Sequence, residues 1–199
     1  MQPLQAPVRV ILITDGDKVA RRATEEAAHR LGLRCISASA GNPSPLTGPE
    51  LVGLIKQAVF DPVLVMVDDK GHPGRGAGEE VISYLCRHPE VRVLGAVAVA
   101  SNTKRAHGVA VDLSITRDCR VVSVPVDKDG YPRAWDSVLR GDTVDVLREL
   151  KLPVVVGIGD PGKMEGADCR EDGCEVTTRA ILEVLSRTVG QIPSILDGE

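Results

Sequence analysis

Residues 9–32 read RVILITDGDKVARRATEEAAHRLG, and this stretch decides the fold class. Its first six residues form a short β-branched run closed by Asp15-Gly16-Asp17, which is typical of a buried strand followed by a turn. Small and apolar residues then recur at a spacing near 3.6 residues until Gly32, which predicts an amphipathic helix ended by that glycine. Asp17 stands where the helix N-cap is expected. The stretch therefore predicts one strand, one turn and one helix.

The alternation of strand and helix continues as far as Ala100. Further buried strands are predicted at 34–40, 62–67 and 91–100, and helices at 51–58 and 79–87. Strands that alternate with helices in this way form a parallel sheet with right-handed crossovers. We therefore expect an α/β fold with an open, mostly parallel sheet and helices on both faces, of Toprim-like or flavodoxin-like topology.

The pattern changes after Ser101. Two short strands, 111–116 and 120–126, flank a three-residue turn and predict a β-hairpin inserted at about 109–127. The remaining predicted elements are a helix at 142–150, a buried strand at 153–158 and a last helix at 176–189. We expect one α/β domain over residues 1–199, with an ordered core from about residue 8 to residue 190.

The composition excludes several classes of function. Four aromatic residues (one Trp, two Tyr and one Phe) among 199 are too few for a stacking platform on single-stranded nucleic acid. A net charge of −4 lacks the basic excess that duplex binding requires. No apolar run reaches the ~20 residues of a membrane-spanning helix, and no signal peptide is recognisable. Five scattered cysteines do not suggest a secreted disulfide scaffold. These features predict a soluble cytoplasmic chain with no nucleic-acid partner and no transmembrane segment of its own.

Carboxylates follow three of the predicted strands. Asp15 and Asp17 follow the first strand, Asp68 and Asp69 follow the third, and Asp160 follows the strand nearest the C-terminus. Ligands of open α/β sheets bind at the carboxyl ends of the strands, and oxygen-rich clusters there suit Mg²⁺ or Ca²⁺. An Asp after a strand also caps helices and forms Asx turns. Metal binding and a structural role are therefore both open for these five residues, and the sequence establishes no cofactor.

Two glycine-rich segments bring basic residues close to these acids. Lys70, His72 and Arg75 lie in a loop suited to closing over an anionic ligand or, equally, to a close backbone connection. Lys163 ends the string GIGDPGK, which has the spacing of the front of a P-loop. The hydroxyl residue that a P-loop needs next is replaced by Met164, so a functional surface loop is the favoured interpretation.

The acids after the first and third strands resemble the Mg²⁺ site of the Toprim fold of topoisomerases and primases. Toprim domains carry a Glu where this chain has Asp15, and an Asp-x-Asp pair where this chain has the adjacent Asp68 and Asp69. Neighbouring residues of an extended chain point in opposite directions, which weakens the match. The resemblance leaves a Toprim-like, Mg²⁺-dependent enzyme of phosphoryl transfer as the alternative function.

Six strings along the chain point to a more specific family. They are VILITDGDKVARRATEEAA (10–28), RCISASAGNPSPLTG (34–48), DPVLVMVDD (61–69), VLGAVAVASNT (93–103), GDTVDVL (141–147) and PVVVGIGDPGKMEG (153–166). Over roughly residues 8–190, the chain resembles the soluble AE-type protein of the stage V sporulation A operon of spore-forming Firmicutes.

The resemblance implies a non-catalytic accessory subunit of the channel that moves dipicolinic acid with Ca²⁺ across the spore inner membrane in sporulation and germination. It implies other stage V sporulation A proteins as partners, soluble and membrane-embedded, and a peripheral position at the outer face of that membrane. It supplies no catalytic residues, and the oligomeric state stays open. Because interfaces rest on aromatic and Arg anchors, Tyr131 and Trp135 are the expected docking residues.

Overall fold

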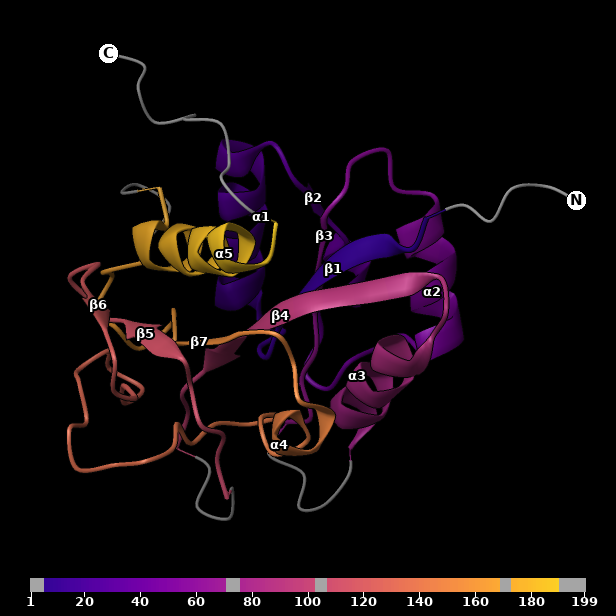
Figure 1. Cartoon of the computed structure of the whole chain (residues 1–199). Helices are drawn as coiled ribbons and strands as arrows, with labels where there is room; N and C mark the ends of the chain where they lie inside the picture. The colour runs from indigo at the N-terminus through magenta and orange to yellow at the C-terminus, as the bar shows by residue number, and fades with distance from the viewer. Residues whose placement is uncertain (1–5, 71–75, 103–106, 169–172, 190–199) are drawn as a thin grey trace, which may run out of the picture.

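The computed structural model of the chain describes residues 6–70, 76–102, 107–168 and 173–189. These residues form a seven-stranded sheet of order β2-β3-β1-β4-β7-β5-β6, which is parallel except for the pair β5–β6 (Figure 1). The strands are β1 (Val8–Ile13), β2 (Arg34–Cys35), β3 (Val63–Met66), β4 (Val91–Val99), β5 (Leu113–Ile115), β6 (Val121–Val122) and β7 (Val155–Ile158). The helices are α1 (Lys18–Leu31), α2 (Gly48–Lys56), α3 (Ala77–Arg87), α4 (Leu147–Leu150) and α5 (Glu175–Thr188).

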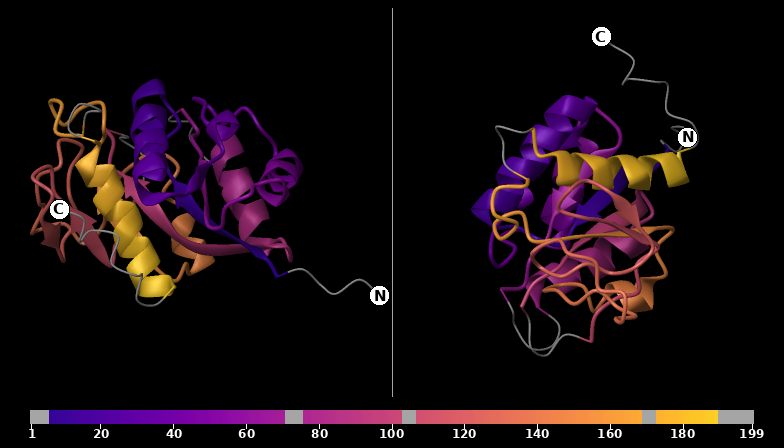
Figure 2. Two further views of the ribbon diagram at one scale, coloured as in Figure 1. Left: turned by 90° about the horizontal axis from the view of Figure 1, so that it is seen from above. Right: turned by 90° about the vertical axis from the view of Figure 1, so that its left-hand side faces the viewer.

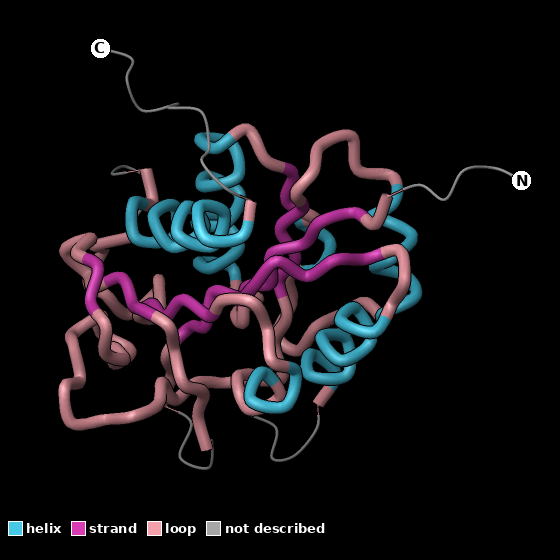
Figure 3. Tube along the Cα trace, viewed as in Figure 1, coloured by secondary structure: helices cyan, strands magenta, loops and turns pink. Residues whose placement is uncertain are grey.

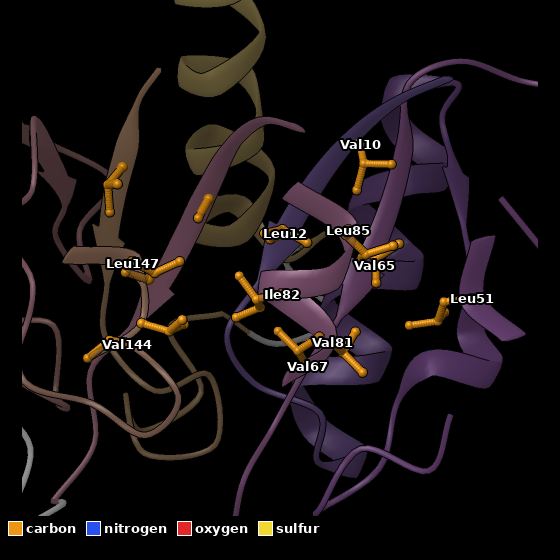
Figure 4. Packing of buried hydrophobic residues seen from close by; sticks show 14 of the residues in the cluster. Val10, Leu12, Leu51, Val65, Val67, Val81, Ile82, Leu85, Val144 and Leu147 are labelled. Atoms are coloured by element: carbon orange, nitrogen blue, oxygen red, sulfur yellow. The ribbon is translucent and has the colours of Figure 1, made fainter. Parts of the chain in front are cut away.

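Helices cover both faces of the sheet (Figures 1 and 2). Successive strand residues point to opposite faces, so Val10 and Leu12 pack against α2 and α3 while Ile11 and Ile13 pack on the side of α1 and α5. Figure 4 shows the first of these two cores, where side chains of β1 and β3 meet those of α2, α3 and the segment around α4. The predicted α/β class, with a mostly parallel sheet and helices on both faces, is confirmed.

The ends of α1 follow from its flanking residues, as predicted. The Asp17 side chain accepts hydrogen bonds from the N–H groups of Val19 (2.7 Å) and Ala20 (2.9 Å), which otherwise lack helical partners. At the other end Gly32 adopts φ 64°, a left-handed conformation that glycine takes without strain. The predicted cap and the predicted stop are both confirmed.

The strand predicted at 34–40 is wrong over most of its length. Only Arg34–Cys35 pair as β2, and Ser37–Ser39 form a 3₁₀ turn. The Ser39 hydroxyl donates to the carbonyl of Ile36 (2.7 Å) and accepts from the N–H of Met66 (2.9 Å). Because serine side chains bond to nearby backbone in this way, they compete with the sheet ladder and end the strand early.

The helix predicted at 142–150 is also shorter, since α4 begins only at Leu147. Backbone donors ahead of it are taken by distant side chains: Asp142 N–H donates to Ser101 Oγ (2.9 Å) and Val146 N–H to Glu79 Oε1 (3.2 Å). Thr143 has φ 60°, which is incompatible with a helix and uncommon for a β-branched residue. Tertiary contacts therefore hold 142–146 in an irregular path (Figure 3).

The predicted hairpin is present as β5 and β6, which pair antiparallel, but the strand predicted at 120–126 is wrong over most of its length, since β6 covers only Val121–Val122. Because β5 also pairs in parallel with β7, the hairpin extends the main sheet at its edge. Among the described residues, no helix has the length and apolar character needed to cross a bilayer.

Candidate functional site

The neighbouring strands β1 and β4 form the point where the direction of the chain connections reverses. From β1 the chain runs through α1 to β2 on one side of the sheet, and from β4 it runs to β5 on the other side. In open α/β sheets, ligands bind at the carboxyl edge next to such a switch point. Asp15 follows β1 and Ser101 follows β4, so both lie at the expected place.

Asp15 lies at the centre of a cluster of carboxylates. Its Oδ1 accepts a hydrogen bond from the N–H of Asp17 (3.0 Å). Burial, aided by the nearby charges of Asp17, Asp68 and Asp160, raises the pKa of Asp15 to about 7, although the hydrogen bond from Asp17 opposes the rise. Four of the five predicted acids therefore lie close enough at the carboxyl edge for their charges to interact.

Asp68 joins two loops of this cluster. Its Oδ2 accepts from the N–H of Gly16 (3.3 Å) and its Oδ1 from the N–H of Lys70 (2.8 Å). Burial raises the pKa of Asp68, and the charge of Asp142 adds to that rise. Gly16 is needed at the contact, because a Cβ there would lie 2.4 Å from the carbonyl oxygen of Gly41. The loops after β1 and β3 are thus packed against each other.

Asp69 has a different set of partners from its neighbour. Its Oδ1 accepts from the N–H of Gly78 (2.6 Å), and its Oδ2 from the N–H of Glu79 (3.2 Å), both in the first turn of α3. Burial raises the pKa of Asp69, although these hydrogen bonds oppose the rise. Asp68 and Asp69 therefore serve separate structural contacts. Within the described ranges, no three His, Cys, Asp or Glu side chains are grouped so as to hold a metal ion.

Lys163 adds a positive charge to the acidic cluster. Its ammonium group forms a short ion pair with Oδ2 of Asp160, whose Oδ1 accepts from the N–H of Gly162 (2.9 Å). The hydrogen bond to Asp160 raises the pKa of Lys163, and the charges of Asp15 and Asp17 act in the same direction. Met164, the next residue, is fully buried in the core. The turn before it is therefore stabilised by contacts of Gly162 and Lys163 with the side chain of Asp160.

The basic loop after β3 is only partly described. Lys70 is exposed, with φ 55°, while the predicted ligand residues His72 and Arg75 lie outside the described residues.

Three residues at this edge were not predicted from the sequence. Asp142 places a further negative charge near Asp68, Glu79 is buried and accepts from the N–H of Val146, and Thr143 is buried in a left-handed conformation. The sequence carried one signal for them: Gly141 precedes two polar residues and thereby marks a turn rather than a helix.

The segment 126–140, here called the lobe, carries both predicted docking residues. Trp135 is 99% exposed and Tyr131 52% exposed. The Arg117 guanidinium lies 5.0 Å from the centre of the Tyr131 ring and donates a hydrogen bond to its hydroxyl (2.8 Å). The structure therefore presents both rings at the surface.

Backbone hydrogen bonds fasten the lobe to the sheet. The N–H of Asp160 donates to the carbonyl of Lys128 (2.8 Å), and the N–H of Ser101 donates to the carbonyl of Arg140 (3.0 Å). The lobe thus bridges the carboxyl ends of β7 and β4, beside the acidic cluster.

Comparison with known proteins adds one finding. A family model described as stage V sporulation protein AE1 matches residues 9–188. No curated protein and no solved structure shows a significant match to the chain.

Proposed function

The chain belongs to the stage V sporulation protein AE1 family, which gives it a sporulation-related role, and from this premise we propose that it is a non-catalytic accessory subunit of the dipicolinic acid channel. It assembles with other stage V sporulation A proteins, both soluble and membrane-embedded, at the outer face of the spore inner membrane. In that position it acts in the uptake of dipicolinic acid with Ca²⁺ during sporulation and in its release during germination.

The exposure of Trp135 is the observation that best supports an assembly role. A tryptophan ring that leaves water removes 150–250 Å² of surface, or roughly 4–6 kcal/mol of transfer free energy. Trp135 has almost all of that surface in solvent, on a lobe held by hydrogen bonds to two strand ends. An exposed aromatic side chain on a segment fastened in this way has the character of an interface anchor.

The test is binding of a double variant, Tyr131→Ala with Trp135→Ala, to the other stage V sporulation A proteins by surface plasmon resonance. We expect the dissociation constant to rise at least about tenfold, because anchor residues commonly contribute more than 1.4 kcal/mol. Phe60→Ala is the matched control, since Phe60 is 57% exposed but lies near β2, at the opposite edge of the sheet. Unchanged binding of the double variant would remove the lobe from the interface.

The proposed location has its own test in sporulating cells. Fractionation should place the protein with the spore inner membrane. Recovery from the forespore core alone would refute this location.

The Toprim-like, Mg²⁺-dependent enzyme is the second candidate, and the clustering of Asp15, Asp17, Asp68 and Asp160 is the observation in its favour. Calorimetric titration with Mg²⁺, Mn²⁺ and Ca²⁺ tests it, with Asp68→Ala as the variant. Specific binding of Mg²⁺ or Mn²⁺ that disappears in the variant would support the enzyme. Titrations without heat would eliminate it and leave the assembly role standing.

A further inference from the structure

A polar cavity of about 280 Å³ lies between the carboxyl end of β4 and the lobe. Ser101 and Asn102 line it on the strand side, and Lys128, Arg133 and Arg140 line it on the lobe side. Its volume is just below the range of drug-sized ligand sites, and it adjoins the end of β4, one of the two strands of the switch point. The cavity has the size and place of a site for a small molecule.

Three basic and three acidic side chains line the cavity, and two of the three basic ones are the arginines. Asp136 accepts from Arg133 Nε (3.2 Å) through one carboxylate oxygen and lies 3.9 Å from Arg140 Nη1 through the other. In the part of the chain that the structure describes, Asp136 is the one carboxylate in contact with either arginine. Two guanidinium groups therefore share one negative charge, and each retains several N–H donors.

The other charged residues of the cavity have hydrogen-bond partners within the lobe, although Asp127 keeps its negative charge. Lys128 Nζ contacts both carboxylate oxygens of Asp129 at 2.7 Å, which cancels that pair of charges. The Asp127 carboxylate accepts from the N–H groups of Asp129 (3.1 Å) and Tyr131 (3.0 Å) within its own turn. The arginine pair is consequently the part of the lining that offers uncommitted donors.

Hydrogen bonds fix the main chain of both arginines. The N–H of Arg133 donates to the carbonyl of Pro125 (2.7 Å) and its carbonyl accepts from the N–H of Asp136 (3.0 Å), while Arg140 is tied to Ser101. Their side chains are 55% exposed, and planar guanidinium groups match the paired oxygens of phosphate and carboxylate groups.

We propose that this cavity binds a small oxyanion, a phosphate or carboxylate group that the guanidinium groups of Arg133 and Arg140 recognise together. The site goes beyond the assembly role, because neither the exposed rings nor the family membership requires it. The carboxylate of Asp136 interacts with both guanidinium groups when the cavity is empty, so it competes with the ligand for their N–H donors.

Calorimetric titration with inorganic phosphate and, separately, with succinate tests the site. We expect saturable heat with at least one of these probes, and the arm that responds distinguishes phosphate from carboxylate recognition. The double variant Arg133→Gln with Arg140→Gln should weaken binding at least about tenfold, since hydrogen bonds to charged groups contribute about 1.5–3 kcal/mol. Asp136→Asn should tighten binding several-fold, because it removes the competing carboxylate.

Arg120→Gln is the matched control, because Arg120 pairs with Asp118 on the exposed hairpin and does not line the cavity. It should leave binding unchanged, and thermal melting should show that every variant is folded. Heats of dilution alone for both probes, with the wild type and with Asp136→Asn, would overturn the proposal. So would an equal loss in Arg120→Gln, which would indicate non-specific attraction to positive charge.

Discussion

Asp15 follows β1 with a carboxyl group that is largely removed from water and close to three other acids. Its pKa of about 7, against an ordinary value of 3.8, means that the folded protein holds a proton that the unfolded chain releases. Between these two pH values the folded state binds more protons, so the free energy of unfolding falls as the pH rises. Ionised Asp15 therefore costs about 4 kcal/mol above pH 7 as an upper bound.

Asp15→Asn should remove this cost and keep the oxygen that accepts from the N–H of Asp17. We expect the variant to gain about 2–4 kcal/mol of stability at pH 8 and about half as much at pH 5, measured by urea unfolding. The gain should grow from pH 4 to pH 7 and then level off. Glu80→Gln, which removes an exposed carboxylate from α3, changes the net charge equally and serves as the control. An equal gain at pH 5 and pH 8 would contradict the assigned titration.

At the scale of the elements, α3 depends on a residue outside it. Asp69, in the loop after β3, accepts from two N–H groups of the first turn of α3, where the N-cap residue Gly76 has no side chain to do so. A Cβ at residue 76 would lie 2.2 Å from Asp69 Oδ1, so the glycine is what admits the aspartate. The helix start is therefore set by a contact across the loop.

Asp69→Ala should destabilise the protein by about 1–3 kcal/mol, because two buried N–H groups lose their acceptor. Asp69→Asn keeps one acceptor oxygen and should lose less. Urea unfolding with and without roughly 5 mM Mg²⁺ separates capping from metal binding. This concentration is chosen because weak sites bind in the millimolar range. An Asp69→Ala loss that appears only with Mg²⁺ would show that the capping role is secondary.

Comparison of the elements shows what the sequence could predict. The strand at 9–14 and the helix after it are governed by local pattern, a cap and a glycine, and all of these were predictable. The irregular path of 142–146 depends on Ser101 and Glu79, which are far away in the sequence, so local helix periodicity was misleading there. Long-range hydrogen bonds leave no periodic signal in one sequence.

The same distinction applies to the candidate site. The gathering of Asp15, Asp68 and Asp160 follows from sheet topology, which the alternation of elements predicts. The separate partners of Asp68 and Asp69, and the pairing of Arg133 and Arg140 around Asp136, depend on how loops fold back onto strand ends. These tertiary contacts became visible only in the folded structure.

For the whole molecule, nearly all the aliphatic core lies in two layers around the sheet, while the chain's one tryptophan lies outside both. The fluorescence of Trp135 should therefore match that of a free tryptophan amide in the same buffer. Unfolding in urea should change far-UV circular dichroism strongly and the emission maximum very little. Docking of a partner on the lobe should shift the emission to the blue, because the ring then leaves water.

If dilute protein alone already emits at shorter wavelength, and the shift disappears on further dilution, the ring is buried between copies of the chain. A blue shift that persists at every concentration would instead place the ring against the chain's own surface, contrary to its 99% exposure.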